Sequence, residues 1–164
     1  MRIANYSANN LNQVYSRDVP GFADVIGASL LANAVTVNGQ TAYRKQEYFR
    51  QQLTVNNGSS AAWQNVSVSG GQSVSGNIYV PKTPESFVYD ADGNLTSDGR
   101  WTYTWDGENR LITMVVNSGV GPSYQLNFSY DFMGRRIQKM VAINGVTASM
   151  LNYIGASRNR VGEF

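Results

Sequence analysis

The sequence predicts an all-β fold: a small β-sandwich followed by an antiparallel strip of β-hairpins. Three observations support this. Only 15% of the residues are charged, below the usual quarter, whereas Gly numbers 16 and Tyr 10. Short runs of aromatic and β-branched residues alternate with polar residues at a period of two. An aromatic–Asp turn signal occurs three times in the second half of the chain.

The first half of the chain divides into a polar segment and a predicted sandwich. Residues 1–19 are rich in Asn and have weak strand character, so they read as a separate segment or as the end of a preceding repeat. Residues 20–82 contain short strand-like runs between Gly-rich turn signals, a pattern typical of a small sandwich. The runs are Val35–Val37, Tyr48–Val55, Trp63–Val68 and Val74–Val80. Asn38-Gly39 predicts a type I′ hairpin.

The second half, residues 86–164, is predicted to be a partial array of hairpins. It follows Pro81-Lys82-Thr83-Pro84, whose two prolines cannot lie in a central strand and therefore mark an edge or a linker. Trp101–Trp105 and Tyr124–Tyr130 both alternate at period two. Two further hairpin signals, Asp98-Gly99 and Asn144-Gly145, join neighbouring strands.

The repeated motif is a four-residue turn that begins with Asp after an aromatic residue and ends on Gly or Asn. Asp in the first position can accept hydrogen bonds from backbone N–H groups of the turn, and the fourth position often needs a positive φ. The aromatic residue is expected to pack on the sheet against its counterpart in the adjacent hairpin. The motif residues are Tyr89, Asp90 and Gly93; Trp105, Asp106 and Asn109; and Tyr130, Asp131 and Gly134.

The string FVYDADGNLTSDGRWTYTWDGENRLITM, followed by FSYDFMGRRIQKMV, resembles the RHS/YD-repeat family over residues 87–141. Its members include bacterial polymorphic toxins, toxin-complex shells and teneurins. The resemblance implies a long β-hairpin strip that spirals into a hollow shell, which in bacteria often encloses a C-terminal toxin. Residues 20–82, with VTVNGQTAYRKQEYFRQQLTV, resemble the immunoglobulin-like β modules found between repeats in some of these proteins.

The chain departs from the family pattern in three ways. Trp105 stands where the motif has Tyr, no Asp-Pro-x-Gly-like segment marks a self-cleavage site, and the tail Ile154–Phe164 ends without another repeat. Three repeats cannot enclose anything, and their unpaired ends would expose edge strands. The chain is therefore expected to be a fragment or a degenerate remnant of a shell. Its expected partners are the remaining repeats of a longer chain or an enclosed C-terminal toxin domain.

Composition excludes several classes of function. The chain has no Cys and no His, which excludes zinc sites built from those ligands, disulfides, thiol catalysis and His-based acid–base catalysis. The net charge of +2 shows no basic stripe, so nucleic-acid binding is not expected. No stretch resembles a signal peptide or a membrane span. Either the protein stays in the cytoplasm or the chain is a segment of a longer exported protein, and the family resemblance implies the second, with a location outside the cell or at its surface.

The acidic residues offer two weak alternatives to turn capping. Asp90–Asn94, with Asp98 nearby, faintly resembles a calcium loop, but the EF-hand spacing is not met. Asp106 and Glu108 lie in one turn, whereas glycosidase carboxylates flank a cleft. The sequence therefore predicts no catalytic residue, no metal ligand and no cofactor.

The aromatic row Trp101, Tyr103 and Trp105 has two interpretations. Period-two spacing favours a packed face, whereas exposed rings could stack on sugars and make the chain a cell-surface module that binds glycan or protein. Three arginines follow the turns: Arg110, Arg135 and Arg136. They are expected to pair with turn carboxylates such as Asp90 or Asp131 on a neighbouring hairpin; binding of an anionic partner is the alternative.

Overall fold

The computed structural model describes residues 4–117, 119–153 and 160–163, and it confirms the all-β prediction. These residues form strands, turns and loops without a helix. None of them belongs to a helix long and apolar enough to cross a membrane. The residue contacts group the chain into two compact units, one of residues 1–7 and 16–85 and the other of residues 8–15 and 86–164.

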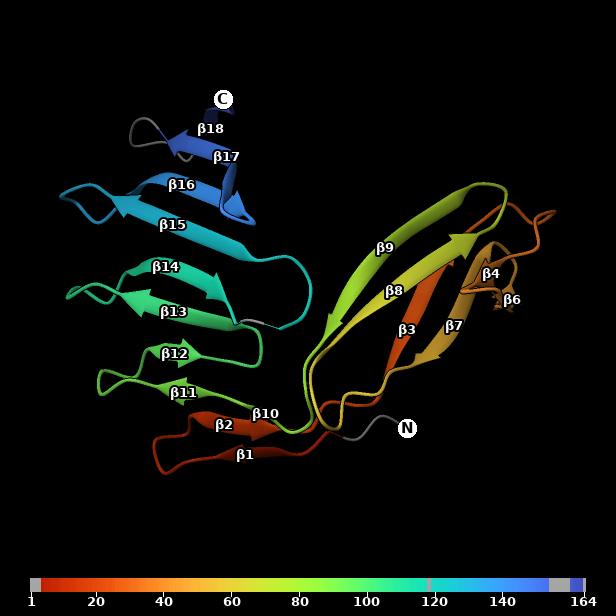
Figure 1. Cartoon of the computed structure of the whole chain (residues 1–164), viewed down its shortest axis with the longest axis horizontal. Coiled ribbons are helices and arrows are strands. Elements are labelled where there is room, and N and C mark those ends of the chain that lie inside the picture. Colours follow the sequence, from red (N-terminus) through yellow and green to blue (C-terminus); the bar gives the residue numbers. More distant parts are fainter. Residues whose placement is uncertain (1–3, 118, 154–159, 164) are drawn as a thin grey trace. The chain divides into compact units, whose positions relative to one another are not determined.

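The first unit contains a sandwich of two antiparallel sheets (Figure 1). One sheet has the order β3 (Phe22–Ala28), β7 (Tyr48–Thr54), β6 (Tyr43–Lys45). The other has the order β5 (Gln40–Thr41), β4 (Thr36–Val37), β8 (Ala62–Ser69), β9 (Ser73–Val80). Both sheets contribute apolar side chains to one core, which contains Val35, Val37, Ala42, Phe49 and Leu53.

Two features of the sandwich differ in how well the sequence predicted them. Asn38 and Gly39 have φ values of 47° and 77°, as a type I′ hairpin requires. By contrast, no expected strand covered β3, which pairs with β7 from Phe22 opposite Thr54 to Ala28 opposite Tyr48. This pairing joins segments far apart in the sequence, so its stabilisation is not visible in a local pattern.

The second unit contains an antiparallel strip in which each strand pairs with the next one along the chain. Figure 1 shows the strip running from β11, in green, to β17, in blue. Its strands are β11 (Val88–Tyr89), β12 (Leu95–Ser97), β13 (Trp101–Trp105), β14 (Leu111–Val116), β15 (Tyr124–Tyr130), β16 (Arg136–Ile143), β17 (Val146–Tyr153) and β18 (Arg160–Glu163). A further sheet has the order β1 (Tyr6–Ala8), β2 (Val14–Arg17), β10 (Glu85–Ser86). The tail, residues 154–164, in which no further repeat is expected, lies largely outside the described residues.

The strip is a single sheet with little core of its own. Among the described residues of the strip, Phe128 is the one apolar side chain that is buried, and it is still 9% exposed. In β13, the aromatic residues are half-buried and the intervening Thr102 and Thr104 are exposed. Since a sheet normally buries one face against a second layer, this strip presents a surface suited to further packing.

Candidate functional site

The turn at Asp106 shows how one copy of the repeated motif is built. Asp106 Oδ1 accepts hydrogen bonds from the backbone N–H groups of Glu108 at 2.9 Å and Arg110 at 3.0 Å. The backbone closes the turn as well: Asn109 N donates to Asp106 O, and Asp106 N donates to Arg110 O, both at 3.0 Å. One carboxylate oxygen therefore organises the whole turn.

The other two turns have the same geometry. In each, the Asp Oδ1 atom accepts from the N–H groups two and four residues further on. These donors are Asp92 (3.0 Å) and Asn94 (2.8 Å) for Asp90, and Met133 and Arg135 (both 2.9 Å) for Asp131.

The fourth residue of each turn lies in the left-handed region. Its φ is 87° at Gly93, 58° at Asn109 and 74° at Gly134. The strand register also shifts at the aromatic residue before each Asp. A turn followed by a left-handed residue and a bulge is a common three-residue hairpin loop, and Gly or Asn adopts that conformation at little cost.

The second carboxylate oxygen binds the side chain four residues further on. Arg110 Nε donates to Asp106 Oδ2, and Arg135 Nε donates to Asp131 Oδ2, both at 2.7 Å. The expectation that these arginines pair with a neighbouring hairpin was therefore wrong, because the turn itself brings positions one and five within reach. At Arg136, the guanidinium lies over the ring of Phe128, 4.8 Å from its centroid.

The aromatic residues link each turn to the one before it. Trp105 Nε1 donates to Leu95 O at 2.8 Å, and Tyr130 OH donates to Leu111 O at 2.9 Å. Both acceptors lie five residues after the Asp of the preceding turn. Each aromatic tip therefore binds a backbone carbonyl of the preceding hairpin, and packing of the ring against its counterpart stays a prediction.

Side chains at the fifth turn position strengthen the same link. Asn94 Nδ2 donates to Asn109 Oδ1 of the next turn at 2.8 Å. The Arg110 guanidinium lies over the ring of Tyr130, 5.2 Å from its centroid. Such a cation–π contact contributes modestly at an exposed site, but here it adds to the hydrogen bonds between turns.

The aromatic row on β13 is half-buried, and its polar tips are engaged. Tyr103 OH donates to Asp98 Oδ2 at 2.6 Å, and Trp105 Nε1 binds the Leu95 carbonyl. The Arg100 guanidinium lies 5.4 Å from the centroid of the Trp101 ring. The row therefore combines a packing role with partly accessible rings.

The acidic residues considered for chemistry serve turns and ion pairs. Asp98 Oδ1 accepts from the N–H groups of Arg100 and Trp101. Asp106 and Glu108 both bind Arg110, at 2.7 Å each. Across the described residues, no three metal-binding side chains of the Asp, Glu, His and Cys types come together.

Two polar residues of the sandwich were not anticipated. Asn57 is 2% exposed, and its Nδ2 donates to the carbonyls of Val19 and Pro81. Arg44 donates to the carbonyls of Ser29, Leu30 and Asn33 in one loop and to that of Gln46. In the sequence, Asn57-Gly58 reads as a hairpin turn. The role of Asn57 as a buried donor depends on segments that are distant in the sequence, so the local pattern did not predict it.

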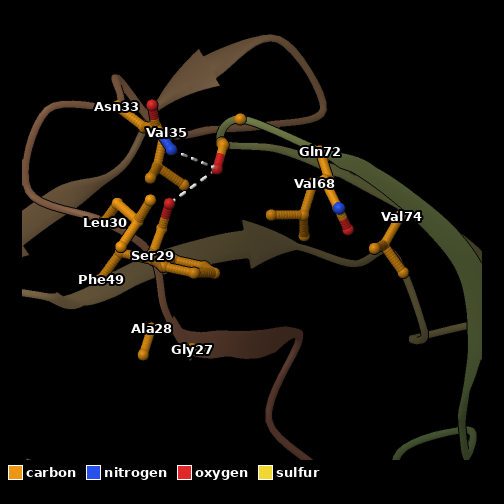
Figure 2. Close-up of a pocket in the computed structure, with 12 residues that line it drawn as sticks. Gly27, Ala28, Ser29, Leu30, Asn33, Val35, Phe49, Val68, Gln72 and Val74 are labelled. Carbon is orange, nitrogen blue, oxygen red and sulfur yellow. Dashed lines mark hydrogen bonds between the residues drawn. The ribbon is translucent and has the colours of Figure 1, made fainter.

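An open cavity of about 730 Å³ lies at one end of the sandwich. Figure 2 shows Val35, Phe49 and Val68 among its lining residues, and the dashed lines mark hydrogen bonds from Ser29 Oγ and Asn33 Nδ2 to the Gly70 carbonyl. Its lining combines these apolar side chains with the polar side chains of Ser29, Asn33 and Gln72.

Hydrogen bonding lowers the pKa of all three turn carboxyls. For Asp106 and Asp131, the main cause is the N–H group of Arg110 or Arg135. For Asp90, partial desolvation opposes the shift, and hydrogen bonds from Asn94 and its neighbours outweigh it.

These shifts predict acid sensitivity of the strip. A carboxyl whose folded pKa is below its unfolded value contributes its full stability above the unfolded pKa, and that contribution is lost as pH falls through the folded pKa. The urea midpoint of the strip should therefore fall below about pH 4. Asp106→Asn should weaken this dependence, and a midpoint that stays constant from neutral pH into this range would contradict the role of the carboxyls.

The chain is similar to small parts of long bacterial proteins, while no family model matches it. It is 45% identical over 79 residues, 48% of its length, to a protein named tRNA nuclease WapA from Bacillus subtilis strain 168. It is 49% identical over 79 residues to tRNA3(Ser)-specific nuclease WapA from Bacillus spizizenii. The match covers 3% of the length of each of these relatives. About half of this chain is therefore homologous to a short segment of WapA.

Proposed function

We propose that this chain is a non-enzymatic structural segment of an RHS/YD-repeat protein. In this proposal an immunoglobulin-like module, residues 20–82, accompanies a hairpin array, residues 86–164. The observation that carries the proposal is the link between turns, in which Trp105 and Tyr130 each donate to a carbonyl of the preceding hairpin. Repeated residues that bind their neighbours build an array.

The exposed surface of the strip supports a role within a larger assembly. Phe132 is 96% exposed and Met133 63% exposed in the third turn, and few of the described side chains of the strip are buried. In a longer chain, further repeats or an enclosed toxin or effector domain would cover such a surface. The array would then form part of a β-shell that encloses or presents that domain, outside the cell or at its surface.

Limited proteolysis of the full-length gene product tests the shell. The C-terminal domain should resist trypsin in the wild type. Trp105→Ala combined with Tyr130→Ala should make it cleavable, because two of the links between hairpins of the shell are lost. Thr104→Ala, at an exposed residue of the same strand as Trp105, serves as a control that should retain protection. A C-terminal domain that trypsin cleaves readily in the wild type would contradict enclosure, and one that stays resistant in the double variant would contradict the role of the two links.

Binding at a cell surface is the second candidate function. The cavity of the sandwich favours it, because Leu30 at its rim is 77% exposed. Its apolar rim suits a protein side chain better than a glycan. The half-buried row at Trp101, Tyr103 and Trp105 is the candidate glycan platform. A signal on a glycan array that Trp101→Ala abolishes would support glycan binding. The absence of any signal on the glycan array would contradict glycan binding.

A further inference from the structure

Residues 8–15 form a turn that lacks the aromatic–Asp signal. Asn9 Oδ1 accepts from the N–H groups of Leu11 at 2.9 Å and Gln13 at 3.0 Å. Asn12 N donates to Asn9 O at 3.0 Å, and Asn9 N donates to Gln13 O at 2.9 Å. Asn12 has a φ of 60°. This is the bonding pattern of the three aromatic–Asp turns, with Asn9 as the capping residue.

The fifth position of this turn also behaves as it does in the other copies. Asn9 Nδ2 donates to Gln13 Oε1 at 2.7 Å, so an amide pair takes the place of the carboxylate–arginine pair. An amide oxygen can cap backbone N–H groups as a carboxylate does, without the charge. Ala8 stands where the other copies have their aromatic residue.

The Asn9 turn is linked to the Asp90 turn as consecutive repeats are linked elsewhere in the strip. Tyr89 OH donates to Val14 O at 2.9 Å, and Val14 lies five residues after Asn9. Gln13 Nε2 lies 3.4 Å from the position that a Cβ atom would occupy at Gly93. The side chain at position five therefore faces the left-handed residue of the following turn, as Asn94 faces Asn109.

Contacts within the first unit hold the beginning and the end of the sandwich segment together. Arg17 Nε and Glu85 Oε2 form an ion pair at 2.5 Å. Val19 N donates to Thr83 Oγ1 at 3.0 Å. Buried Asn57 also binds carbonyls on both sides, those of Val19 and Pro81. The chain therefore enters and leaves the sandwich at neighbouring points.

We infer that residues 8–15 are an Asn-capped repeat of the array and that the sandwich is an insert between two consecutive repeats. The docking surface of this repeat is the Val14 carbonyl with the Gln13 side chain. The partner that fits it is the next turn, through the aromatic Tyr89 and the left-handed Gly93. The links between consecutive repeats thus continue from the Asn9 turn to the Asp90 turn, although the sandwich is inserted between them in the sequence. This holds whether or not the array encloses a toxin domain.

Hydrogen exchange on the full chain tests this inference. Asn9→Ala should speed exchange about tenfold at the amides of Leu11 and Gln13 and in the turn that Asp90 begins, because it removes two hydrogen bonds from a docked repeat. Exchange at Leu53 in the sandwich core should stay unchanged. Asn10→Ala, a substitution at an exposed neighbour, is the matched control and should leave all of these rates unchanged.

A second variant tests the identity of the turn as a repeat. Asn9→Asp combined with Gln13→Arg recreates the pair seen at Asp106 and Arg110, and protection should be kept or increased. The inference would be overturned if Asn9→Ala left the Asp90 turn unaffected, or if the double variant lost protection. Proteolysis of the full-length product can fail independently, so failure of the shell proposal would be recognised separately.

Discussion

Trp105→Ala is expected to lower the free energy of unfolding of the strip by about 3 kcal/mol. The half-buried indole packs on the sheet, and its Nε1 atom binds the Leu95 carbonyl of the preceding hairpin. Truncation removes the packing and leaves that carbonyl without this donor. Denaturation in urea, followed by hydrogen exchange of the strip amides, measures the loss.

Two further variants separate the contributions of the indole. Trp105→Phe keeps most of the packing but removes the donor, so about 1 kcal/mol should be lost. Phe132→Ala, at a residue that is 96% exposed, should change stability by less than about 0.5 kcal/mol. If Phe132→Ala destabilised the strip as strongly as Trp105→Ala, the assignment of Trp105 to the link between turns would be wrong.

Phe49→Ala is expected to lower the free energy of unfolding of the sandwich by about 3–5 kcal/mol. Phe49 is 7% exposed and belongs to the core that both sheets share. Its ring lies over Gly27, where an added Cβ atom would lie 2.6 Å from the ring. Exchange rates at Leu53 and Val37 should report the loss.

The neighbouring residue provides the control for Phe49. Tyr48 is 60% exposed on the opposite face of the strand, so Tyr48→Ala should cost much less. Gly27→Val should also destabilise the sandwich, because the added side chain would displace the Phe49 ring. If the sandwich is an inserted module, Phe49→Ala should lower its stability without an equal loss of stability in the strip. An equal rise in amide exchange in the strip around Trp105 would contradict insertion.

The turns were predictable from the sequence because their physics is local. A cap at Asp106 and a left-handed residue at Asn109 are sufficient to define the loop, and both fall within one short segment. Alternation in Trp101–Trp105 likewise indicated the strand and its half-buried face. The direction of the links between turns could not be read from the motif, since the acceptors are backbone carbonyls.

The features that the sequence did not predict depend on distant partners. Asn9 caps a turn without Asp or an aromatic neighbour, so its identity as a repeat depends on the link from Tyr89. Phe22–Ala28 becomes a strand by pairing with residues 48–54, and its small residues give a weak β signal. Asn57 acts as a buried donor only because three segments meet there.

The exchange rate of the Trp105 indole N–H tests the linked array most directly. This proton lies in the hydrogen bond that joins one repeat to the next, and NMR can follow it in the intact chain. The linked array predicts exchange at least about tenfold slower than that of a solvent-exposed indole. A rate equal to that of free tryptophan in the same buffer would contradict it.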